Sequence, residues 1–431
     1  MNDDAVYIIG AKSLLSGKFI DLANPNHSPL INYLPGYPLL LAPFVKIVDP
    51  HWIYLKFLSS VLIAISGLLL WKLLDPWFSP LFRLLFLCSF VFNPTVVNIS
   101  SMVMSEPCFL FSFSLALITL KSLIQSYRPW KPWVLGLLLG WASLIRPQGI
   151  CLILGVSIAL LHKKQWGNWA KATFLSVGIY GGIYLRNYFL TKFLAGYMSE
   201  WNELLPYLGR NYDQYLAQTY EMFKTFFIFS LFPIPTLLSR PYQSIAYLFT
   251  CFLGIVFGGI GIAHVVQKKK LPEELVLSIT LSCFFCSILQ MLWARIEPRY
   301  FFFFIPFSLL FIFSGAESIL SRLPRKKLWA SLGFFLLMAV YANANLRYLS
   351  YSNSKSQIQS VPFQTFQWIR ENVPKKAIFL SINRPTLFLY TGHCGYDYFN
   401  TDDIDDFRYT LSKEKITHVM FVHENILYFS F

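Results

Sequence analysis

The stretch WVLGLLLGWASLIRPQGICLILGVSIALLHKK, from Trp133 to Lys164, decides the fold of this chain. It contains two apolar runs separated by Arg146 and Pro147, and it ends in a pair of lysines. A proline disfavours helical backbone at the residue before it, so the two runs are predicted to be separate helices. Neither run carries a charge in its interior, which is typical of helices that lie in lipid. The pattern indicates a multispan membrane protein.

The same pattern extends over most of the 431 residues, of which 55% are apolar, 18% aromatic and only 13% charged. Crossing a bilayer core takes ~20 helical residues, and fewer where helices kink or pack deeply. We therefore predict an α-helical polytopic membrane protein with about ten or more spans. The main spans are predicted at residues 52–75, 82–99, 104–121, 133–146, 148–161, 170–190, 244–266, 275–294, 300–320 and 328–345.

Two further apolar segments are interrupted by prolines. Residues 33–48 are predicted to form a broken segment, and residues 225–240 a re-entrant or interfacial one. Proline removes a helix hydrogen bond, and backbone exposed to lipid does not tolerate that loss.

The basic residues predict the orientation of the spans. The net charge is +14, and lysines and arginines cluster in every second gap between apolar runs. Cytoplasmic loops carry such an excess, so the remaining gaps, the N-terminal segment and the C-terminal tail are predicted to be extracytoplasmic. Basic residues placed at the ends of apolar segments also argue against a nucleic-acid partner. The clusters are Lys72 and Arg83; Lys121, Arg128 and Lys131; Lys163, Lys164 and Lys171; Lys268, Lys269 and Lys270; and Arg322, Arg325, Lys326 and Lys327.

The tail after about residue 355 alternates apolar and polar stretches. Residues 366–370 are predicted to form an amphipathic helix, and residues 377–381 and 418–422 buried strands. We expect a small extracytoplasmic α/β domain that serves as a lid or scaffold, or contributes to catalysis. The predicted division is a first external loop at 1–51, a transmembrane helical domain at 52–350 and the α/β domain at 351–431.

A set of acids and arginines lies outside the basic clusters, and the orientation places it on one membrane face. Its members are Asp3, Asp4, Glu106, Arg186, Arg295 and Arg299. The acids at 3, 4 and 106 could serve only as helix caps, or they could be site acids. The arginines are either interfacial anchors or ligands for phosphate. Arg146, between two short spans, needs a partner because an unpaired charge in the membrane is costly.

Several short motifs occur in the same order as in a known family. Asp3-Asp4-Ala5-Val6-Tyr7, followed by Leu34-Pro35-Gly36-Tyr37-Pro38, resembles the first external loop of GT-C glycosyltransferases. The closest branch is that of protein O-mannosyltransferases and lipid A aminoarabinose transferases. Further similar motifs are Ser105-Glu106, Arg146-Pro147-Gln148-Gly149, Leu185-Arg186-Asn187-Tyr188 and Arg295-x-x-Pro298-Arg299-Tyr300.

The resemblance implies transfer of a sugar from a polyprenyl-phosphate donor to an extracytoplasmic lipid, glycan or protein acceptor. Asp3 matches the key acid of the family, Asp4 stands where the family often has Glu, and Glu106 is the second acid. No nucleotide sugar is expected, no cofactor is certain, and a divalent cation stays open. The expected donor-phosphate ligands are Arg146, Arg186, Arg295, Arg299 and Tyr300, and the expected acceptor-side contacts are His27 and Tyr37.

Two alternative functions and two further expectations remain. A secondary transporter or lipid flippase would also place charges among spans, but around a midplane site. A non-catalytic membrane scaffold of the same fold is the other alternative. The family has a transmembrane helix before the acidic loop, so we expect ~20 apolar residues upstream of residue 1. The protein is expected in the bacterial inner or plasma membrane, in contact with membrane lipids.

Overall fold

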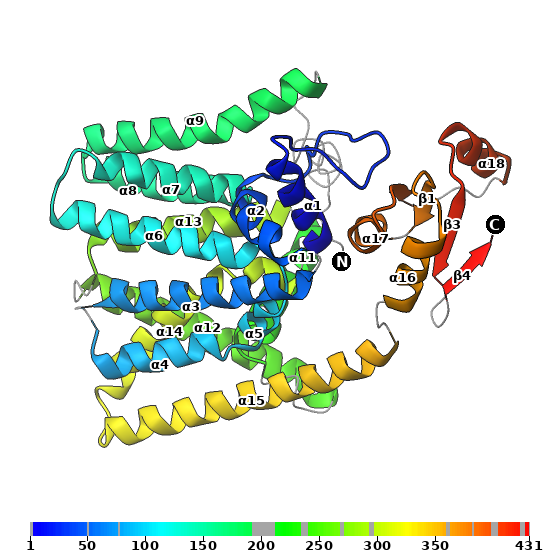
Figure 1. The fold of residues 1–431 in the computed structure, drawn as a ribbon. Coiled ribbons are helices and arrows are strands. Elements are labelled where there is room, and N and C mark those ends of the chain that lie inside the picture. The colour runs from blue at the N-terminus through cyan, green and yellow to red at the C-terminus, as the bar shows by residue number, and fades with distance from the viewer. Residues whose placement is uncertain are drawn as a thin grey trace. The chain divides into compact units, whose positions relative to one another are not determined.

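The computed structural model describes residues 3–49, 51–75, 78–191, 212–233, 240–267, 271–292, 297–358, 363–381, 383–397, 404–422 and 427–430. Helices dominate these residues (Figure 1). The chain divides into two compact units. The first unit combines Met1–Leu55 with Tyr348–Phe431, and the second is Lys56–Arg347. The predicted first loop and the predicted tail therefore fall in the same unit.

The second unit is a bundle of helices that lie side by side (Figure 1). Its elements are α3 (Leu55–Leu74), α4 (Pro80–Val91), α5 (Pro94–Ser100), α6 (Ser105–Gln125), α7 (Lys131–Ile145), α8 (Gly149–His162), α9 (Trp166–Thr191), α11 (Tyr212–Lys224), the π-helix η2 (Thr225–Leu231), α12 (Arg240–Gln267), α13 (Glu273–Leu292), the 3₁₀ turn η4 (Pro298–Phe301), α14 (Phe304–Leu320) and α15 (Lys326–Ile358), whose last residues belong to the first unit. The main pairs pack α12 on α14, α7 on α9, α8 on α13 and α6 on α7.

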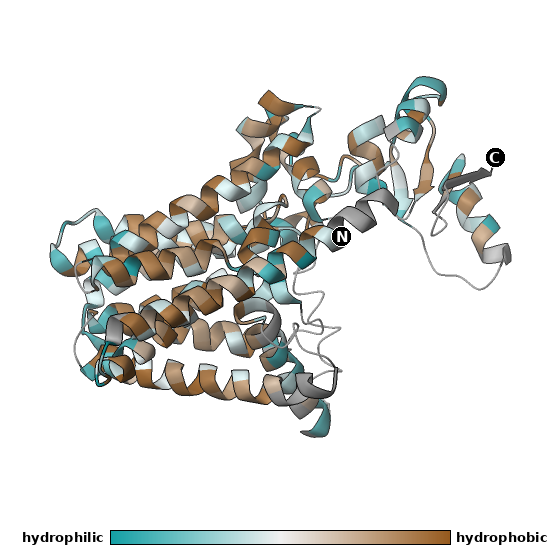
Figure 2. Ribbon diagram, turned by 90° about the horizontal axis from the view of Figure 1, so that it is seen from below, coloured by the Kyte–Doolittle hydropathy of each residue, from teal (hydrophilic) through white to brown (hydrophobic). Residues whose placement is uncertain are grey.

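Hydrophobic residues run along these helices, and hydrophilic residues gather towards their ends (Figure 2). Among the described residues, five segments are long and apolar enough to cross a membrane. They are Trp52–Leu74, Ser105–Gln125, Leu248–Gln267, Glu273–Gln290 and Leu328–Ser350. The helices α7, α8 and α14 are apolar but shorter. The predicted count of ten or more spans stays a prediction.

The predicted span at 82–99 forms two helices, α4 and α5, with a bend of 58° between them. Together they pass the same test of length and composition, which raises the number of candidate spans to six. Asn93 caps the second helix, and Pro94 occupies its first position. Proline suits the start of a helix and interrupts its interior, so the bend falls at this pair.

Two lysines of the predicted cytoplasmic gaps cap the ends of helices. Lys131 is only 4% exposed, and its Nζ lies 2.6 Å from the carbonyl oxygens of Ser122 and Ser126 at the end of α6. Carbonyl groups in the last turn of a helix lack partners within it, and the negative end of the helix dipole attracts cations. Lys121 donates likewise to three carbonyls at the end of α3, those of Lys72, Leu73 and Asp75.

The first unit contains helices and a four-stranded sheet of order β2-β1-β3-β4. The strand β1 pairs in parallel with β2 and β3, and β3 pairs antiparallel with β4. The predicted amphipathic helix and both predicted strands are present, as α16, β1 and β3. The elements are α1 (Asp3–Leu15), α2 (Gly36–Val48), η1 (Trp52–Tyr54), α16 (Phe363–Asn372), β1 (Phe379–Ser381), α17 (Arg384–Thr391), β2 (Gly395–Asp397), α18 (Ile404–Lys413), β3 (His418–Val422) and β4 (Leu427–Ser430).

The early and late parts of the first unit are joined by direct contacts. The N–H of Gly395 donates to the carbonyl of Ala23 at 2.9 Å, and Asn26 Nδ2 donates to the Tyr396 hydroxyl at 3.2 Å. A Cβ atom at Gly395 would lie 2.5 Å from the carbonyl oxygen of Phe379, so only glycine fits this strand. Helix α17 also packs on α1, which carries the two leading aspartates. The tail therefore supports the acidic N-terminal helix.

Candidate active site

A largely buried ion pair joins Glu106 in α6 to Arg146 in the α7–α8 turn. Arg146 Nη1 lies 2.8 Å from Glu106 Oε1, and the exposed side-chain fractions are 14% and 4%. The same Nη1 donates to Ser105 Oγ at 3.0 Å. The cap residue of α6 is Met104, so Glu106 lies in the first turn, where the positive end of the helix favours a carboxylate. Glu106 therefore does more than cap a helix.

The turn that presents Arg146 follows from its sequence. Helix α7 ends at Ile145, and Arg146 is extended, with φ −147° and ψ 147°, as the following Pro147 favours. A Cβ atom on Gly149 would lie 2.2 Å from Ser143 Cα, so glycine lets α8 begin directly against the end of α7. The turn is also held by Arg146 Nε, which donates to Gln148 Oε1 at 3.3 Å. The predicted break between two short helices is confirmed.

A second arginine lies beside the same site. The turn η4 carries Arg299 and Tyr300, and Arg299 Nε forms a 2.7 Å ion pair with Glu297. Arg299 Nη2 donates to the Tyr300 hydroxyl at 3.4 Å. The guanidinium carbons of Arg299 and Arg146 lie 5.1 Å and 5.9 Å from the centre of the Tyr300 ring, within the range of a cation–π contact. Tyr300 thus joins the two arginines.

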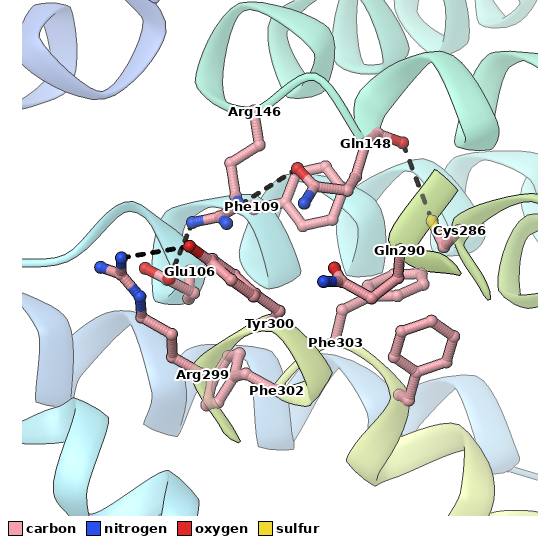
Figure 3. A pocket seen from close by; sticks show the side chains of 11 residues that line it. Glu106, Phe109, Arg146, Gln148, Cys286, Gln290, Arg299, Tyr300, Phe302 and Phe303 are labelled. Atoms are coloured by element: carbon pink, nitrogen blue, oxygen red, sulfur yellow. Dashed lines mark hydrogen bonds and ion pairs between the residues drawn. The ribbon is translucent and has the colours of Figure 1, made fainter. Parts of the chain in front are cut away.

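Glu106, Arg146, Arg299 and Tyr300 line one pocket, which Figure 3 shows from close by. The charged side chains of Glu106, Arg146 and Arg299 lie together at one side of it with Tyr300, whereas Gln148 and Gln290 lie among the phenylalanines at the other side (Figure 3). We name Glu106, Arg146, Glu297, Arg299 and Tyr300 the arginine cluster. The full pocket lining is Glu106, Phe109, Arg146, Gln148, Cys286, Gln290, Arg299, Tyr300, Phe302, Phe303 and Phe304. Charged and apolar groups side by side suit a ligand with a phosphate head and a hydrocarbon tail.

The leading aspartates belong to the first unit. Asp3 and Asp4 open α1, and the Tyr33 hydroxyl donates to Asp3 Oδ1 at 3.1 Å. The Tyr33 ring meets Tyr7 edge-on, with centroids 5.6 Å apart. Burial, and then the charge of Asp4, raise the pKa of Tyr390 in α17. The acidic end of α1 is therefore contacted by the Tyr33 hydroxyl, and the charge of Asp4 acts on Tyr390 of the C-terminal segment.

The remaining predicted site residues lie elsewhere. Tyr37 is fully buried and packs edge-on against Tyr7, with centroids 5.1 Å apart. His27 is exposed and has a positive φ of 48°. Arg186 donates to Asn187 Oδ1 at 2.8 Å within α9 and does not line the pocket. Arg295 lies outside the described residues. The roles predicted for these four residues stay predictions.

Sequence reasoning missed two members of the site. Glu297 is the counter-ion of Arg299, and its signal was its position two residues before that arginine. Gln148 holds Arg146 from within the Arg146-Pro147-Gln148-Gly149 motif.

Comparison with known proteins gives the fold. No family model and no curated protein sequence matches the chain. It is similar to the Archaeoglobus fulgidus oligosaccharyltransferase in complex with Zn and sulfate, with TM-score 0.62 and 12% identity, over 97% of this chain and 63% of that one. ArnT from Cupriavidus metallidurans in the apo state gives TM-score 0.53 and 12% identity, over 96% and 84%. ArnT bound to undecaprenyl phosphate gives 0.50 and 13%, over 97% and 85%.

Both solved proteins belong to the GT-C superfamily, as the motifs of the sequence predict. The chain shares the fold of these two proteins, and its long apolar helices are those of an integral membrane protein. Identities of 12–13% show the fold alone, and the chain spans about 63% of the length of the oligosaccharyltransferase.

Proposed function

We propose that this protein is a membrane glycosyltransferase that transfers a sugar from a polyprenyl-phosphate donor to an extracytoplasmic acceptor. The arginine cluster is the observation that carries the proposal. Two guanidinium groups, each held by a glutamate, flank Tyr300 beside a wall of phenylalanines. A lipid phosphate matches both halves of this surface, because arginine binds phosphate oxygens in a planar fork and the phenylalanines suit an isoprenoid chain.

The arginines would act on the leaving group. When the bond between the anomeric carbon and the donor phosphate breaks, negative charge grows on the polyprenyl phosphate. Hydrogen-bond donors on the protein that already point towards the place where charge develops stabilise the transition state, because they need no rearrangement during the reaction. Glu106 and Glu297 hold Arg146 and Arg299 in fixed positions before the donor arrives. The cluster is therefore suited to a reaction whose leaving group is an anion.

Asp3 would serve the acceptor. An acceptor hydroxyl loses its proton as its oxygen bonds to the anomeric carbon, and a carboxylate within hydrogen-bond reach can accept that proton. The Tyr33 hydroxyl orients the Asp3 carboxylate from one side. For an acceptor that is already an anionic phosphate, Asp3 would position the acceptor instead. The charge pattern of the sequence predicts the extracytoplasmic side for Asp3, Glu106 and Arg299 alike.

The test uses purified full-length protein in vesicles with a panel of labelled polyprenyl-phosphate sugars. We expect release of polyprenyl phosphate and transfer or hydrolysis of the sugar. The substitution Asp3→Asn should lower the rate about 100-fold or more. The substitution Arg299→Gln should lower it by a similar factor.

Matched controls are Asp49→Asn and Arg83→Gln, which remove a surface acid and an arginine paired outside the cluster. Both controls should keep the wild-type rate. Full activity of Asp3→Asn would remove Asp3 from the mechanism. Movement of the labelled lipid from one leaflet of the vesicle membrane to the other, without any sugar transfer, would indicate a flippase instead.

A further inference from the structure

A buried polar network surrounds Asn93, at the bend between α4 and α5. Its side chain is fully buried. Its Oδ1 accepts the N–H groups of Thr95 at 3.0 Å and Val96 at 3.4 Å, which caps the first turn of α5. Asparagine is among the best residues at this position. Capping accounts for the oxygen of the side chain and leaves its amide nitrogen to be explained.

The amide nitrogen of Asn93 contacts two other elements. Nδ2 donates to the carbonyl of Ser230 in η2 at 2.8 Å and to the Tyr341 hydroxyl of α15 at 3.2 Å. The Tyr341 hydroxyl in turn donates to the carbonyl of Leu231 at 2.8 Å. Ser230 and Tyr341 are fully buried as well. One side chain therefore joins α5, η2 and α15, and we name Asn93, Ser230 and Tyr341 the Asn93 joint.

The joint continues to the turn that carries Arg299. The Ser230 hydroxyl lies 3.3 Å from the carbonyl oxygen of Pro298, the first residue of η4, and 3.2 Å from that of Thr225. Both carbonyl oxygens are within reach of its single proton. Both α5 and η2 pack against η4. The Phe226 ring of η2 lies 5.6 Å from that of Phe301. The residue after Pro298 is Arg299, so the joint ends one residue from the arginine cluster.

The π-helical conformation of η2 explains why the hydrogen bonds of the Asn93 joint matter. A π-helix is rare and often occurs at functional sites. As at the end of any helix, the carbonyl groups of its last turn lack partners within the helix. Here Asn93 and Tyr341 bind the carbonyls of its last two residues. Buried polar groups that are fully satisfied fix a single arrangement, because an unsatisfied group in a region of low dielectric is costly. The Asn93 joint therefore holds α5 and η2, which pack against η4, in one arrangement.

We propose that Asn93, Ser230 and Tyr341 are positioning residues for the donor phosphate, acting through the η4 turn on Arg299 and Tyr300. This inference rests on the proposed function. None of the three residues needs to touch the substrate. A displacement of about 1 Å at a catalytic group can cost about 100-fold in rate, so a joint this near the cluster can control the reaction.

Two substitutions separate this role from capping and from general stability. Asn93→Ser keeps an oxygen that can cap α5 but removes both amide donors. Tyr341→Phe removes only the hydroxyl that binds the Leu231 carbonyl. The matched control is Ser112→Ala, which removes another buried hydrogen bond between helices, from Ser112 Oγ to the Leu138 carbonyl at 3.0 Å.

In the vesicle assay, Asn93→Ser and Tyr341→Phe should each lower kcat/KM for the polyprenyl-phosphate sugar about tenfold or more, with the acceptor KM unchanged. Ser112→Ala should match the wild type. Wild-type values for both joint variants, or an equal loss in Ser112→Ala, would overturn the inference. An inactive wild type would instead count against the proposed function.

A second readout does not depend on activity. Tyr300→Cys is placed in a background in which the seven native cysteines are replaced by serine, and its rate of maleimide labelling is measured. Asn93→Ser and Tyr341→Phe should raise this rate several-fold, and Ser112→Ala should not. Equal rates in all variants would show that the joint does not hold η4. If Asn93→Ser does not fold, Tyr341→Phe decides the outcome alone.

Discussion

Arg384 in α17 forms a 2.9 Å ion pair with Asp21 in the first loop, so a residue near the end of the sequence holds one near its beginning. The same Nη2 lies 3.1 Å from Asp397 Oδ2 at the end of β2. The side chains of Arg384 and Asp21 are only 12% and 14% exposed. Removing one partner of a largely buried pair leaves the other charge uncompensated.

Replacing Arg384 should therefore loosen the first unit. We expect Arg384→Met to destabilise the full-length protein by about 1–3 kcal/mol, below the value for a fully buried pair because Asp397 is half exposed. Thermal unfolding in detergent measures the effect. The control Arg370→Met changes an exposed arginine of the same unit and should have little effect. Equal melting temperatures for the two variants would show that the ion pair does not support the unit.

The first unit should lose stability in mild acid because of His393. This side chain is fully buried, and burial lowers its pKa below the ordinary 6.5. The unfolded chain then binds a proton near pH 6.5 while the folded chain does not, so stability falls as the pH drops below 6.5. The slope is about 1.4 kcal/mol per pH unit until the folded pKa is reached. His418, whose pKa burial also lowers, contributes in the same direction.

Unfolding measured from pH 7.5 to pH 5 checks this prediction. The wild type should lose stability below pH 6.5, and His393→Gln should show a shallower slope because glutamine does not titrate. A glutamine can also donate to the carbonyls of Val373 and Pro374, which lie 3.3 Å and 3.2 Å from His393 Nε2. An unchanged slope in the variant would assign the acid sensitivity to other groups.

Neutralising Glu106 should impair the donor site without removing an arginine. Glu106→Gln leaves Arg146 without the carboxylate that orients it, so we expect kcat/KM for the donor to fall about tenfold or more. The control Glu221→Gln neutralises an exposed glutamate paired with Lys224 and should leave kcat/KM for the donor unchanged. Transfer assays with varied donor concentration measure the effect. Wild-type kinetics in Glu106→Gln would mean that Arg146 is positioned by Ser105 and Gln148 alone.

Removing the Tyr33 hydroxyl should slow the reaction by a smaller factor than removing the Asp3 carboxylate. Tyr33→Phe keeps the ring contact with Tyr7 and loses only the 3.1 Å hydrogen bond to Asp3. A hydrogen bond to a charged group contributes about 1.5–3 kcal/mol, which corresponds to about a tenfold to hundredfold lower rate if it orients the reacting carboxylate. Rates at saturating donor test this. A rate equal to that of wild type would show that Asp3 is oriented by other contacts.

Much of the helical framework could be predicted from the sequence because its signals are local. The break at Arg146-Pro147 and the helix opened by Ser105 follow from proline chemistry and apolar run length. The basic gaps were identified by composition, and the structure adds that Lys121 and Lys131 bind helix carbonyls. At these residues the local sequence pattern predicts the same helix boundaries that the structure shows.

Other features depend on contacts between distant parts of the chain. The bend at Asn93 lies inside an apolar run, and its stabilising partners are more than 130 residues away, at Ser230 and Tyr341. Glu106 and Arg146 are 40 positions apart, and neither of their sequence motifs predicts that the two side chains form an ion pair. The sequence indicates which residue types form the candidate site, whereas the pairing partner of each residue can be identified only from the three-dimensional structure.

Each arginine of the cluster has its own glutamate, and this balance has a consequence for turnover. With Glu106 beside Arg146 and Glu297 beside Arg299, two positive charges face two negative ones before any donor binds. An incoming phosphate would share the guanidinium N–H groups with these carboxylates, which stay beside the arginines before and after the reaction. Under the proposed function, a spent lipid carrier would therefore leave an electrically neutral resting site instead of staying as a tightly held product.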